Sequence, residues 1–431
     1  MGSYPKAIQM KDCLLHLGRG QAPAYYDGES NVYAINQKCV RDGAVRIEYA
    51  RPHDPRKKLK DSSVLQDGDV CINSTGTGTI GRIGLWNEQR RNGDSFFADS
   101  HVTIARPDKE IANPKFLASI LQSDEYQAII ETHCFSGSTN QVELNKKALG
   151  DLSVYLLDKK SQDVVAKILS AVDQAIEQTE AIITKQQRIK TGLMQDLLTK
   201  GIDEQGNIRS EETHEFKDSP LGRIPVKWTP RLLRDVGIWK SGGTPSKSEP
   251  KYWDGNIPWV CPKDMKCFDL GRTIDTITPL GARTGSKVVP RDTVMIVVRG
   301  MILAHTFPVS ITRSDMAFNQ DIKAIIPFEF ISGRFLAYWF YSNGSQLLKI
   351  VTTATHGTKR FDTNDLHDVS IAIPDGYEQE KICEIIDQSS LLISQCEEQL
   401  FKLQSLNTAL MQDLLMGDVS VANLLDEQST I

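Results

Sequence analysis

Three acidic and basic residues have a spacing that could do hydrolytic chemistry. Asp254, Asp264 and Lys266 follow a D…DxK pattern, which metal-dependent nucleases use to hold Mg²⁺ and a water molecule. Such spacings are common by chance, and hydrolysis also requires a fixed cage around the metal. We therefore interpret the three residues as structural, and a stand-alone magnesium-dependent nuclease remains an alternative function.

A glycine pattern at residues 76–81 matches the dinucleotide-binding signature GxGxxG. That signature requires a strand before the glycines and a helix that begins at them. The residues that follow, RIGLW at 82–86, are typical of another strand. We therefore predict a glycine-rich hairpin whose small polar side chains can approach a backbone.

The remaining motifs for catalysis are incomplete or missing. Asn113-Pro114-Lys115-Phe116 resembles the Asn-Pro-Pro-Phe/Tyr motif of amino-methyltransferases, but the second proline is absent, which favours a helix start. There is no GxxxxGK[ST] phosphate loop, no HExxH and no CxxC pair. We expect the eight cysteines to be reduced and mostly buried. We predict no structural zinc, no other metal site and no catalytic residue.

The elements that position any site are organised by an internal repeat. The pentamer Met194 to Leu198 returns unchanged as Met411 to Leu415, 217 positions later. The same offset carries Gln162 onto Gln379. An ungapped offset over some fifty residues indicates an internal duplication.

Each repeat ends in a long stretch with apolar residues at heptad spacing. This spacing predicts one helix from about Ser161 to Lys200 and a second from about Glu378 to Met416. The first predicted seam contains Val165, Ile168, Val172, Ala175, Thr179, Ile182, Gln186, Ile189 and Leu193. The second contains Ile382, Ile385, Leu392, Cys396, Gln399, Leu403, Leu406 and Leu410. Helices of this length span about 57 Å, and we expect them to form an antiparallel coiled coil.

The two remaining regions alternate short apolar runs with turn residues, which is typical of strands. Examples are VYAI at 32–35 and TVMIVV at 293–298, and we expect helices over 116–130 and 335–350. The predicted fold class is α+β, with two mixed globular domains, two long helices and a pseudo-twofold. The predicted parts are domain 1 at 1–155, a central spacer helix at 156–202, a linker at 203–229, domain 2 at 230–375, a C-terminal spacer helix at 376–418 and an acidic tail at 419–431.

Composition indicates the class of protein, and charge distribution indicates its partners. The chain has no run of 18 apolar residues and no apolar signal-peptide core, so we expect a cytoplasmic protein. The net charge is −5, but residues 230–360 hold 18 Lys/Arg against 10 Asp/Glu, and residues 361–431 hold 2 against 14. Basic regions beside an acidic end fit a DNA-binding protein with a separate docking part, although ordinary solvated surface could give the same distribution.

In combination, several stretches resemble one family. They are KTGLMQDLLTKGID at 190–203 with LNTALMQDLLMGDVSV at 406–421, FKDSPLGRIPVKW at 216–228, SGGTPSKSEPKYWDGNIPWVCPKDM at 241–265, INSTGTGTIGRIGLW at 72–86 and DSHVTIARP at 99–107. The chain resembles the specificity subunit of type I restriction–modification systems, and the resemblance covers nearly the whole chain. The first globule lacks the LGRIPVKW lead-in of the second, so its start is less certain.

The resemblance implies a non-catalytic subunit in which two target-recognition domains each read half of a bipartite, non-palindromic site on double-stranded DNA. The helices would fix the spacing between the half-sites and dock two methyltransferase subunits, which methylate adenine N6. Restriction and translocase subunits would join through the complex. The resemblance also implies that S-adenosylmethionine, ATP and magnesium belong to those partners, with no cofactor here. A coiled-coil scaffold without a DNA role is a third alternative.

Basic and small polar residues in loops are the candidates for DNA contact. In the first domain they are Arg19, Arg41, Arg46, Arg51, Asn73, Ser74, Thr75, Thr77 and Arg82. In the second they are Ser241, Thr244, Ser246, Lys263, Arg299, His356, Lys359 and Arg360. For binding partner subunits the candidates are the repeated helix ends, Met194, Leu197, Leu198, Met411, Leu414 and Leu415.

Overall fold

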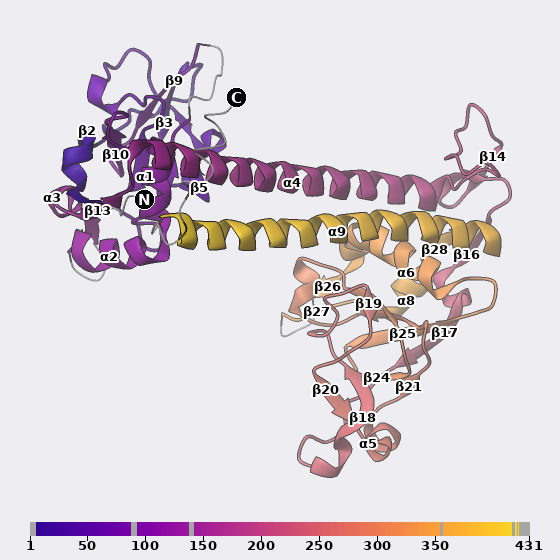
Figure 1. The fold of residues 1–431 in the computed structure, drawn as a ribbon. Helices are drawn as coiled ribbons and strands as arrows, with labels where there is room; N and C mark the ends of the chain where they lie inside the picture. Colours follow the sequence, from indigo (N-terminus) through magenta and orange to yellow (C-terminus); the bar gives the residue numbers. More distant parts are fainter. Residues whose placement is uncertain are drawn as a thin grey trace. The chain divides into compact units, whose positions relative to one another are not determined.

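The computed structural model describes residues 6–87, 93–137, 142–353, 357–415, 419 and 421. The chain divides into two compact units, Met1–Glu180 with Glu398–Ile431 as unit 1 and Ala181–Glu397 as unit 2. Each unit therefore combines a globular region with one half of each long helix. Figure 1 shows the elements of both units.

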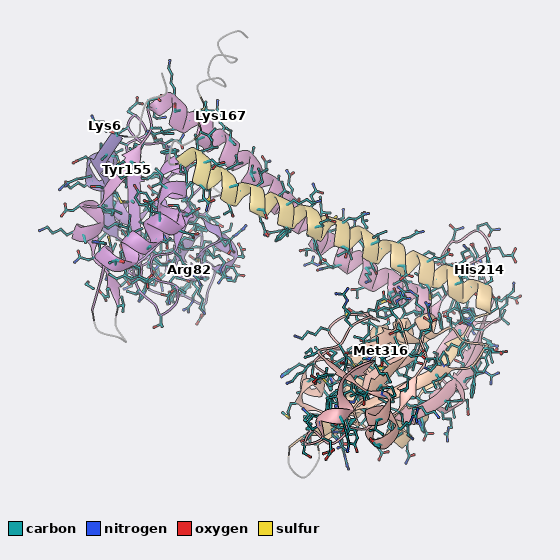
Figure 2. The ribbon with its side chains drawn as sticks, turned by 60° about the horizontal axis from the view of Figure 1, so that its bottom comes forward. Lys6, Arg82, Tyr155, Lys167, His214 and Met316 are labelled. Atoms are coloured by element: carbon teal, nitrogen blue, oxygen red, sulfur yellow. The ribbon has the colours of Figure 1, made fainter. Side chains whose placement is uncertain are left out.

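Unit 1 is built on a six-stranded sheet whose strand order differs from the order along the chain. The strand order is β2 (Leu14–Arg19), β10 (Val102–Pro107), β7 (Val70–Asn73), β8 (Ile83–Leu85), β5 (Gly43–Val45) and β4 (Val40–Arg41). A second sheet holds β6 (Arg51–Pro52), β3 (Val32–Ile35) and β9 (Ser95–Ala98), and β3 runs parallel to β9. Two ribbons complete the unit: β11 (Phe135–Ser136) with β12 (Glu143–Leu144), and β1 (Lys6–Gln9) with β13 (Ser153–Leu156). Lys6 and Tyr155 mark the second ribbon in Figure 2.

Unit 2 repeats this plan. Its main sheet has the order β17 (Gly237–Ser241), β25 (Ile322–Pro327), β22 (Val294–Val297), β23 (Val309–Thr312) and β19 (Asp269–Leu270). Its second sheet holds β20 (Asp275–Ile277), β18 (Trp253–Val260), β24 (Met316–Phe318) and β21 (Val288–Val289), and β18 runs parallel to β24. The ribbons are β26 (Thr352–Thr353) with β27 (Lys359–Arg360), and β16 (Thr229–Leu232) with β28 (Ser370–Ile373). Since β16 is the counterpart of β1, Lys6–Gln9 already belong to the first repeat.

Short helices α1 (Pro114–Gln122) and α6 (Gly333–Ser342) pack on the main sheets, and both predicted short helices are broken. The predicted helix over 116–130 is two helices, α1 and α2 (Asp124–Cys134), because Ser123 ends one and its side chain caps the other. The predicted helix over 335–350 is likewise broken at Asn343, into α6, α7 (Gly344–Leu347) and a 3₁₀ turn at Leu348–Ile350. The other short helices are α3 (Lys146–Gly150), α5 (Pro279–Gly285) and α8 (Thr363–His367).

The two long helices confirm the central prediction of the fold. α4 spans Lys159–Thr199 and α9 spans Gly376–Leu415, with 41 and 40 residues. In unit 1 the first part of α4 shares a core with the last part of α9, and Asn407 Nδ2 donates to Asp173 at 3.2 Å. In unit 2 the last part of α4 shares a core with the first part of α9. The two helices thus pack antiparallel as a coiled coil.

The register of the predicted seam is wrong at several positions. Ile182 and Ile189 are 48% and 47% exposed, whereas Ile183 is buried. In α9, Leu392 and Leu406 are exposed, and Ile386 and Ile393 are buried instead. Where two adjacent residues are apolar, either could belong to the seam, and the packing against the facing helix decides which of them is buried.

One buried glutamine joins each long helix to its globular region. The Gln162 carbonyl accepts from the Asn113 N–H at 2.8 Å, and its amide donates to the backbone carbonyls of Ile111 and Leu157. Gln379 repeats all three contacts, with Ser332, Phe330 and Pro374. Both side chains are 1% exposed. The 217-residue offset therefore marks a repeated structural joint.

Residues 203–229, predicted as a polar linker, are folded onto the start of α9. They form the hairpin β14 (Phe216–Ser219) and β15 (Gly222–Pro225). The Glu378 carboxylate accepts from the Ile202 N–H, from both terminal nitrogens of Arg209 and from Trp228 Nε1 at 2.5–3.1 Å. Trp228 is fully buried and the Arg209 side chain is 12% exposed. This segment is therefore part of unit 2.

Candidate nucleic-acid interface

One edge of the main sheet in unit 1 gathers three loops that are far apart in sequence. The β7–β8 loop meets the turn after β9, because the Ser74 N–H donates to the His101 carbonyl at 2.7 Å. The Ser74 carbonyl accepts from the Leu144 N–H of β12 at 2.9 Å. Gly76 and Gly78 have φ angles of 99° and 75°, which side-chain-bearing residues rarely adopt. We call residues 73–82, 99–101 and 143–144 the loop edge of unit 1.

Unit 2 has the same arrangement at the equivalent place. The Arg299 N–H donates to the Asp321 carbonyl at 3.3 Å, and the Gly300 N–H donates to the Lys359 carbonyl at 3.0 Å. Gly300 has a φ of 139°. Residues 298–300, 319–321 and 359–360 thus form the loop edge of unit 2.

Backbone pairing shows which residues correspond between the two loop edges. Thr75 bridges to Glu143 in unit 1, and Arg299 bridges to Arg360 in unit 2. The turn after β9 is closed by the His101 N–H donating to the Asp99 carboxylate at 2.7 Å. The turn after β24 is closed in the same way, by the Asp321 N–H and the Asn319 side chain at 3.1 Å. Thr75 and Arg299 therefore occupy the same position in the two units.

Two of the predicted unit 1 residues are buried and support the loop instead of facing solvent. Asn73 donates to the Gln37 carbonyl at 3.0 Å, and Ser74 Oγ lies 2.6 Å from Thr103 Oγ1. Both side chains are fully buried, so neither can reach a base edge, and their assignment to DNA contact is corrected. Thr75 is half-buried, and its Oγ1 is itself buried, with no hydrogen-bond partner within the described ranges. Thr77 is exposed at the tip.

The predicted arginines of unit 1 separate into two sets. Arg19 and Arg82 belong to the loop edge: Arg19 pairs with Glu143 at 3.0 Å, and Arg82, labelled in Figure 2, donates to the Gly78 carbonyl. The other three are used within the fold. Arg46 pairs with Glu177 of α4 at 2.9 Å, and Arg41 and Arg51 stack over Tyr49 and Tyr25 at 4.3 and 3.5 Å. Arg46 is therefore held against the helix, and its contact with DNA stays a prediction.

Five predicted residues of unit 2 are brought together around the β24–β25 turn. Thr244 Oγ1 donates to Gln320 at 2.6 Å, and Ser241 Oγ accepts from Lys323 at 2.6 Å. Burial lowers the pKa of Lys323 below its usual 10.5. The other three are Arg299, Lys359 and Arg360.

Arg299 is exposed and only weakly paired. Its side chain is 56% exposed, and its Nε lies 4.0 Å from Asp321. Lys359 Nζ donates to Thr353 Oγ1 at 2.8 Å. Of the remaining candidates, Ser246 is exposed beside Ser248, Lys263 is exposed in the loop after β18, and His356 lies outside the described residues.

Sequence reasoning missed residues that the fold brings to the same edges. In unit 1, Gln37 follows β3, which runs parallel to β9, and in unit 2, Gln320 follows β24, which runs parallel to β18. The carboxyl ends of such paired parallel strands meet at one edge. Lys323 follows Gln320 on β25. The basic run PRKKLK at 55–60 is a further signal of this kind in the sequence.

The motifs for catalysis have structural roles. Residues 76–81 turn between antiparallel strands β7 and β8, with no helix after them. Asn113 caps α1, accepting from the backbone of Lys115 and Phe116. Asp264 accepts from the N–H groups of Cys261 and Ile274 at 2.8 Å. Within the described ranges, no three His, Cys, Asp or Glu side chains gather as metal ligands would, and no helix there could cross a membrane.

The residues predicted to bind partner subunits are largely inside the protein. Met194, Leu197 and Leu198 belong to the core of unit 2, and Leu414 and Leu415 belong to the core of unit 1. Met411 is half-buried. The repeated pentamer therefore anchors the helix ends, and the partner assignment is corrected because these side chains offer little surface.

Other apolar residues on the long helices are exposed. In unit 2 they are Ile182 and Ile189 on α4, with Tyr377, Leu391 and Leu392 on α9. In unit 1 they include Phe401, which is 70% exposed, and Leu406. Exposed apolar residues gathered on helix faces are typical of interaction surfaces.

Comparison with known proteins identifies similar chains. A family model described as the type I restriction modification DNA specificity domain matches residues 54–186 and 225–402. The EcoR124I/EcoR124II specificity subunit of Escherichia coli is 32% identical over 205 residues, 47% of this chain and 50% of that protein. The MjaIX specificity subunit of Methanocaldococcus jannaschii is 28% identical over 190 residues, 43% of each. The chain thus spans about half the length of these curated relatives.

A solved structure resembles the whole fold. The crystal structure of a type I restriction–modification S subunit from M. genitalium superposes with a TM-score of 0.55 at 16% identity. The match covers 95% of this chain and 96% of that one. It supports the fold with two repeated units and two long helices.

Proposed function

The chain belongs to the type I restriction–modification DNA specificity family, and on this premise we propose that it selects the DNA site for such a system. Unit 1 would read one half of a bipartite site and unit 2 the other. The observation that carries this proposal is the loop edge, which is built twice from equivalent strands but presents Thr75 in one unit and Arg299 in the other. Two different sets of side chains on one frame are what reading two different half-sites requires.

The chain would have no catalytic activity of its own. We propose that two methyltransferase subunits bring S-adenosylmethionine and methylate adenine N6, and that restriction subunits bring ATP and magnesium in a cytoplasmic complex. The long helices would dock the methyltransferase subunits through their exposed apolar residues, with Phe401 and Tyr377 as the most exposed on α9. They would also fix the gap between half-sites, since a continuous helix is stiffer than a flexible linker.

The test is the methylation pattern of the assembled complex. This chain is co-expressed with its methyltransferase subunits, and N6-methyladenine is mapped across the host genome. We expect a bipartite motif with a fixed gap. Inserting one heptad into both α4 and α9, between residues 180 and 181 and between 397 and 398, should change the gap while leaving both half-sites unchanged. A methylation pattern without a bipartite motif would overturn the proposal.

The nuclease alternative is tested with the purified chain. Asp264 already accepts two backbone N–H groups, which is typical of a turn-stabilising carboxylate. We expect no cutting of plasmid DNA by the chain with Mg²⁺. Cutting that is lost in the Asp264→Asn variant would favour the nuclease, and sequence-independent binding by the complex would favour a scaffold.

A further inference from the structure

A basic loop in unit 1 lies directly beside the loop edge. Residues 55–60 read PRKKLK, and Lys57, Lys58 and Lys60 are exposed. None of the three forms an ion pair with another described residue. Arg56 differs, because it pairs with Asp54 at 2.8 Å and lowers the pKa of that carboxyl to about 2. Three positive charges in this loop are therefore free to meet an external anion.

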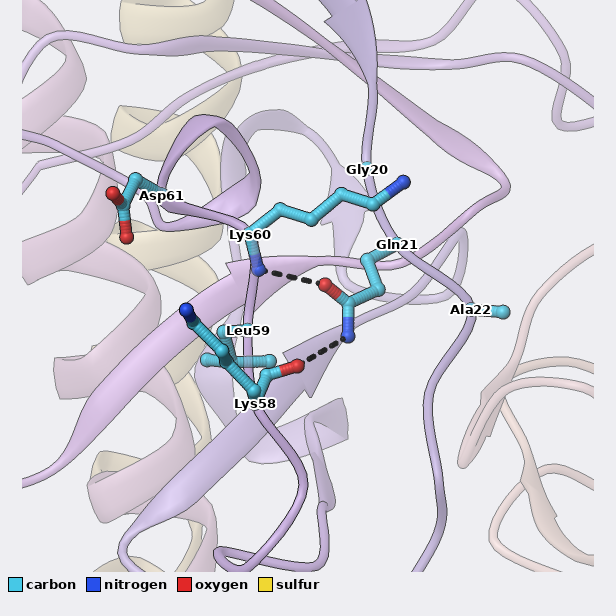
Figure 3. A pocket seen from close by; sticks show the side chains of 7 residues that line it. All are labelled: Gly20, Gln21, Ala22, Lys58, Leu59, Lys60 and Asp61. Atoms are coloured by element: carbon cyan, nitrogen blue, oxygen red, sulfur yellow. Dashed lines mark hydrogen bonds between the residues drawn. The ribbon is translucent and has the colours of Figure 1, made fainter.

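One side chain holds this loop in place. Gln21 Nε2 donates to the Lys58 carbonyl at 3.1 Å, and Gln21 Oε1 accepts from the Lys60 N–H at 2.8 Å (Figure 3). Gln21, Lys58 and Lys60 line an open groove of about 640 Å³ with Asp61. Because a single glutamine satisfies both backbone groups, it fixes the direction of the lysine-bearing segment.

The loop is joined to the loop edge through backbone contacts. The Gln21 N–H donates to the Ala98 carbonyl at 3.0 Å, and Gln21 bridges to Asp99. Asp99 begins the turn whose last residue, His101, accepts from Ser74. The lysines therefore extend the candidate DNA-contacting surface of unit 1 beyond the residues that could read bases.

Unit 2 cannot form the same arrangement. The Gly243 N–H donates to the Phe318 carbonyl at 2.9 Å, which makes Gly243 the counterpart of Gln21. A side chain at Gly243 would overlap the Gly285 carbonyl. Where unit 1 has the loop at 55–60, unit 2 has helix α5. The glutamine-held loop is thus a property of unit 1 alone.

We propose that Lys57, Lys58 and Lys60, held by Gln21, form a phosphate clamp that grips the DNA backbone beside the half-site read by unit 1. This inference rests on the proposed function. Lysines recognise phosphate as point charges and carry no base specificity. The clamp therefore contributes affinity that depends on salt, and it positions the half-site against the loop edge.

The test measures how binding by the assembled complex depends on salt. Each phosphate contact contributes about 0.9 to the slope of log K against log salt concentration. The K57A/K58A/K60A variant should lower the slope by up to about 2.7 while the recognised sequence stays the same. The Gln21→Ala variant keeps the lysines and should give a smaller loss, because the loop is no longer held.

The matched control removes three lysines elsewhere in unit 1. Lys6, Lys109 and Lys160 are exposed on segments at the other end of β10 from the Asp99–His101 turn, although Lys109 pairs with Asp67. The K6A/K109A/K160A variant should keep the original slope. An equal loss in this control, or an unchanged slope in K57A/K58A/K60A with site-specific binding intact, overturns the clamp. Absence of site-specific binding by the unmodified complex overturns the proposed function and the clamp together.

Discussion

The two units share a frame, by which we mean their sheets and the starts of their long helices, and they differ in the loop edges that face solvent. The Asp158 carboxylate accepts from the N–H three residues on, in the first turn of α4, and Asp375 does the same in α9. Gly20 and Gly242 are both pressed against a carbonyl, of Ala98 and Phe318, where a methyl group would overlap. Both repeats thus keep an aspartate at the start of the long helix and a glycine where the backbone leaves no room for a side chain.

The loop edges have not kept their side chains. Thr75 is replaced by Arg299, and His101 by Asp321, at positions with the same backbone contacts. Gln21 is replaced by Gly243. The comparison teaches that the frame and the candidate interface vary independently, which is what a protein with two different half-sites requires.

The largest expected effect is at a position in the first turn of the long helices where the two units differ. Glu378 accepts four hydrogen bonds from residues 202–228, and its counterpart is Ser161, which only donates to Asp158 at 2.7 Å. Glu378→Ala should destabilise unit 2 by about 3–5 kcal/mol, because it leaves the largely buried Arg209 and the buried Trp228 indole N–H without their partner. Ser161→Ala should cost about 1 kcal/mol in unit 1. Urea unfolding measures both losses, and hydrogen exchange of the Ile202 amide reports the change at Glu378. Equal losses would contradict the difference.

The next largest effect concerns the two buried glutamines, which make the same three contacts in both units. Gln162→Ala and Gln379→Ala each leave one backbone N–H and two carbonyls without partners. Each should lower the stability of its own unit by about 2–4 kcal/mol. The controls are Gln178→Ala and Gln388→Ala, which change exposed positions of the same helices. Urea midpoints that fall for only one of the two buried glutamines would show that the joints are not equivalent.

Patterns within one segment predicted much of the frame. The 217-residue offset and the heptad spacing located both long helices, and short apolar runs located strands such as β3 and β22. The start of α1 followed from Asn113-Pro114. The helices, strands and caps depend on neighbours in sequence, so periodicity and capping rules predict them, and the offset is read by comparing the sequence with itself.

The candidate interface depends on contacts between distant residues. Arg46 looked like any basic loop residue, but its partner Glu177 is 131 positions away. The role of Gln21 depends on a loop 37 positions further on. The choice between Ile182 and Ile183 likewise depends on the facing helix. A single sequence gives residue types and local spacing, and only the folded backbone pairs them.

A smaller effect should appear in the recognised sequence when loop-edge positions of the two units are changed. Arg299→Ala should relax one base of one half-site by about 1–3 kcal/mol. Thr77→Val removes the exposed hydroxyl at the tip of the unit 1 loop, so it should relax a base in the other half-site. Arg291→Ala is the control, because Arg291 is exposed just before β22 and Arg299 lies beyond its other end. Binding to a set of single-base variants measures this, and relaxation of the same half-site by both changes would refute the assignment of one unit to each half.

The smallest effect is a pH dependence that both units should share. Burial lowers the pKa of His16 in unit 1 and of His367 in unit 2 below the usual 6.5, and nearby positive charges, Arg106 and Lys323, add to this. The unfolded chain then binds more protons than the folded one around pH 6, so stability rises with pH up to about 6.5 and falls below it. Both rings are only half-buried, so the change is small. His16→Asn and His367→Asn should each flatten the difference between urea midpoints at about pH 5.5 and 7.5. A variant that keeps the full difference would mean that its histidine does not contribute.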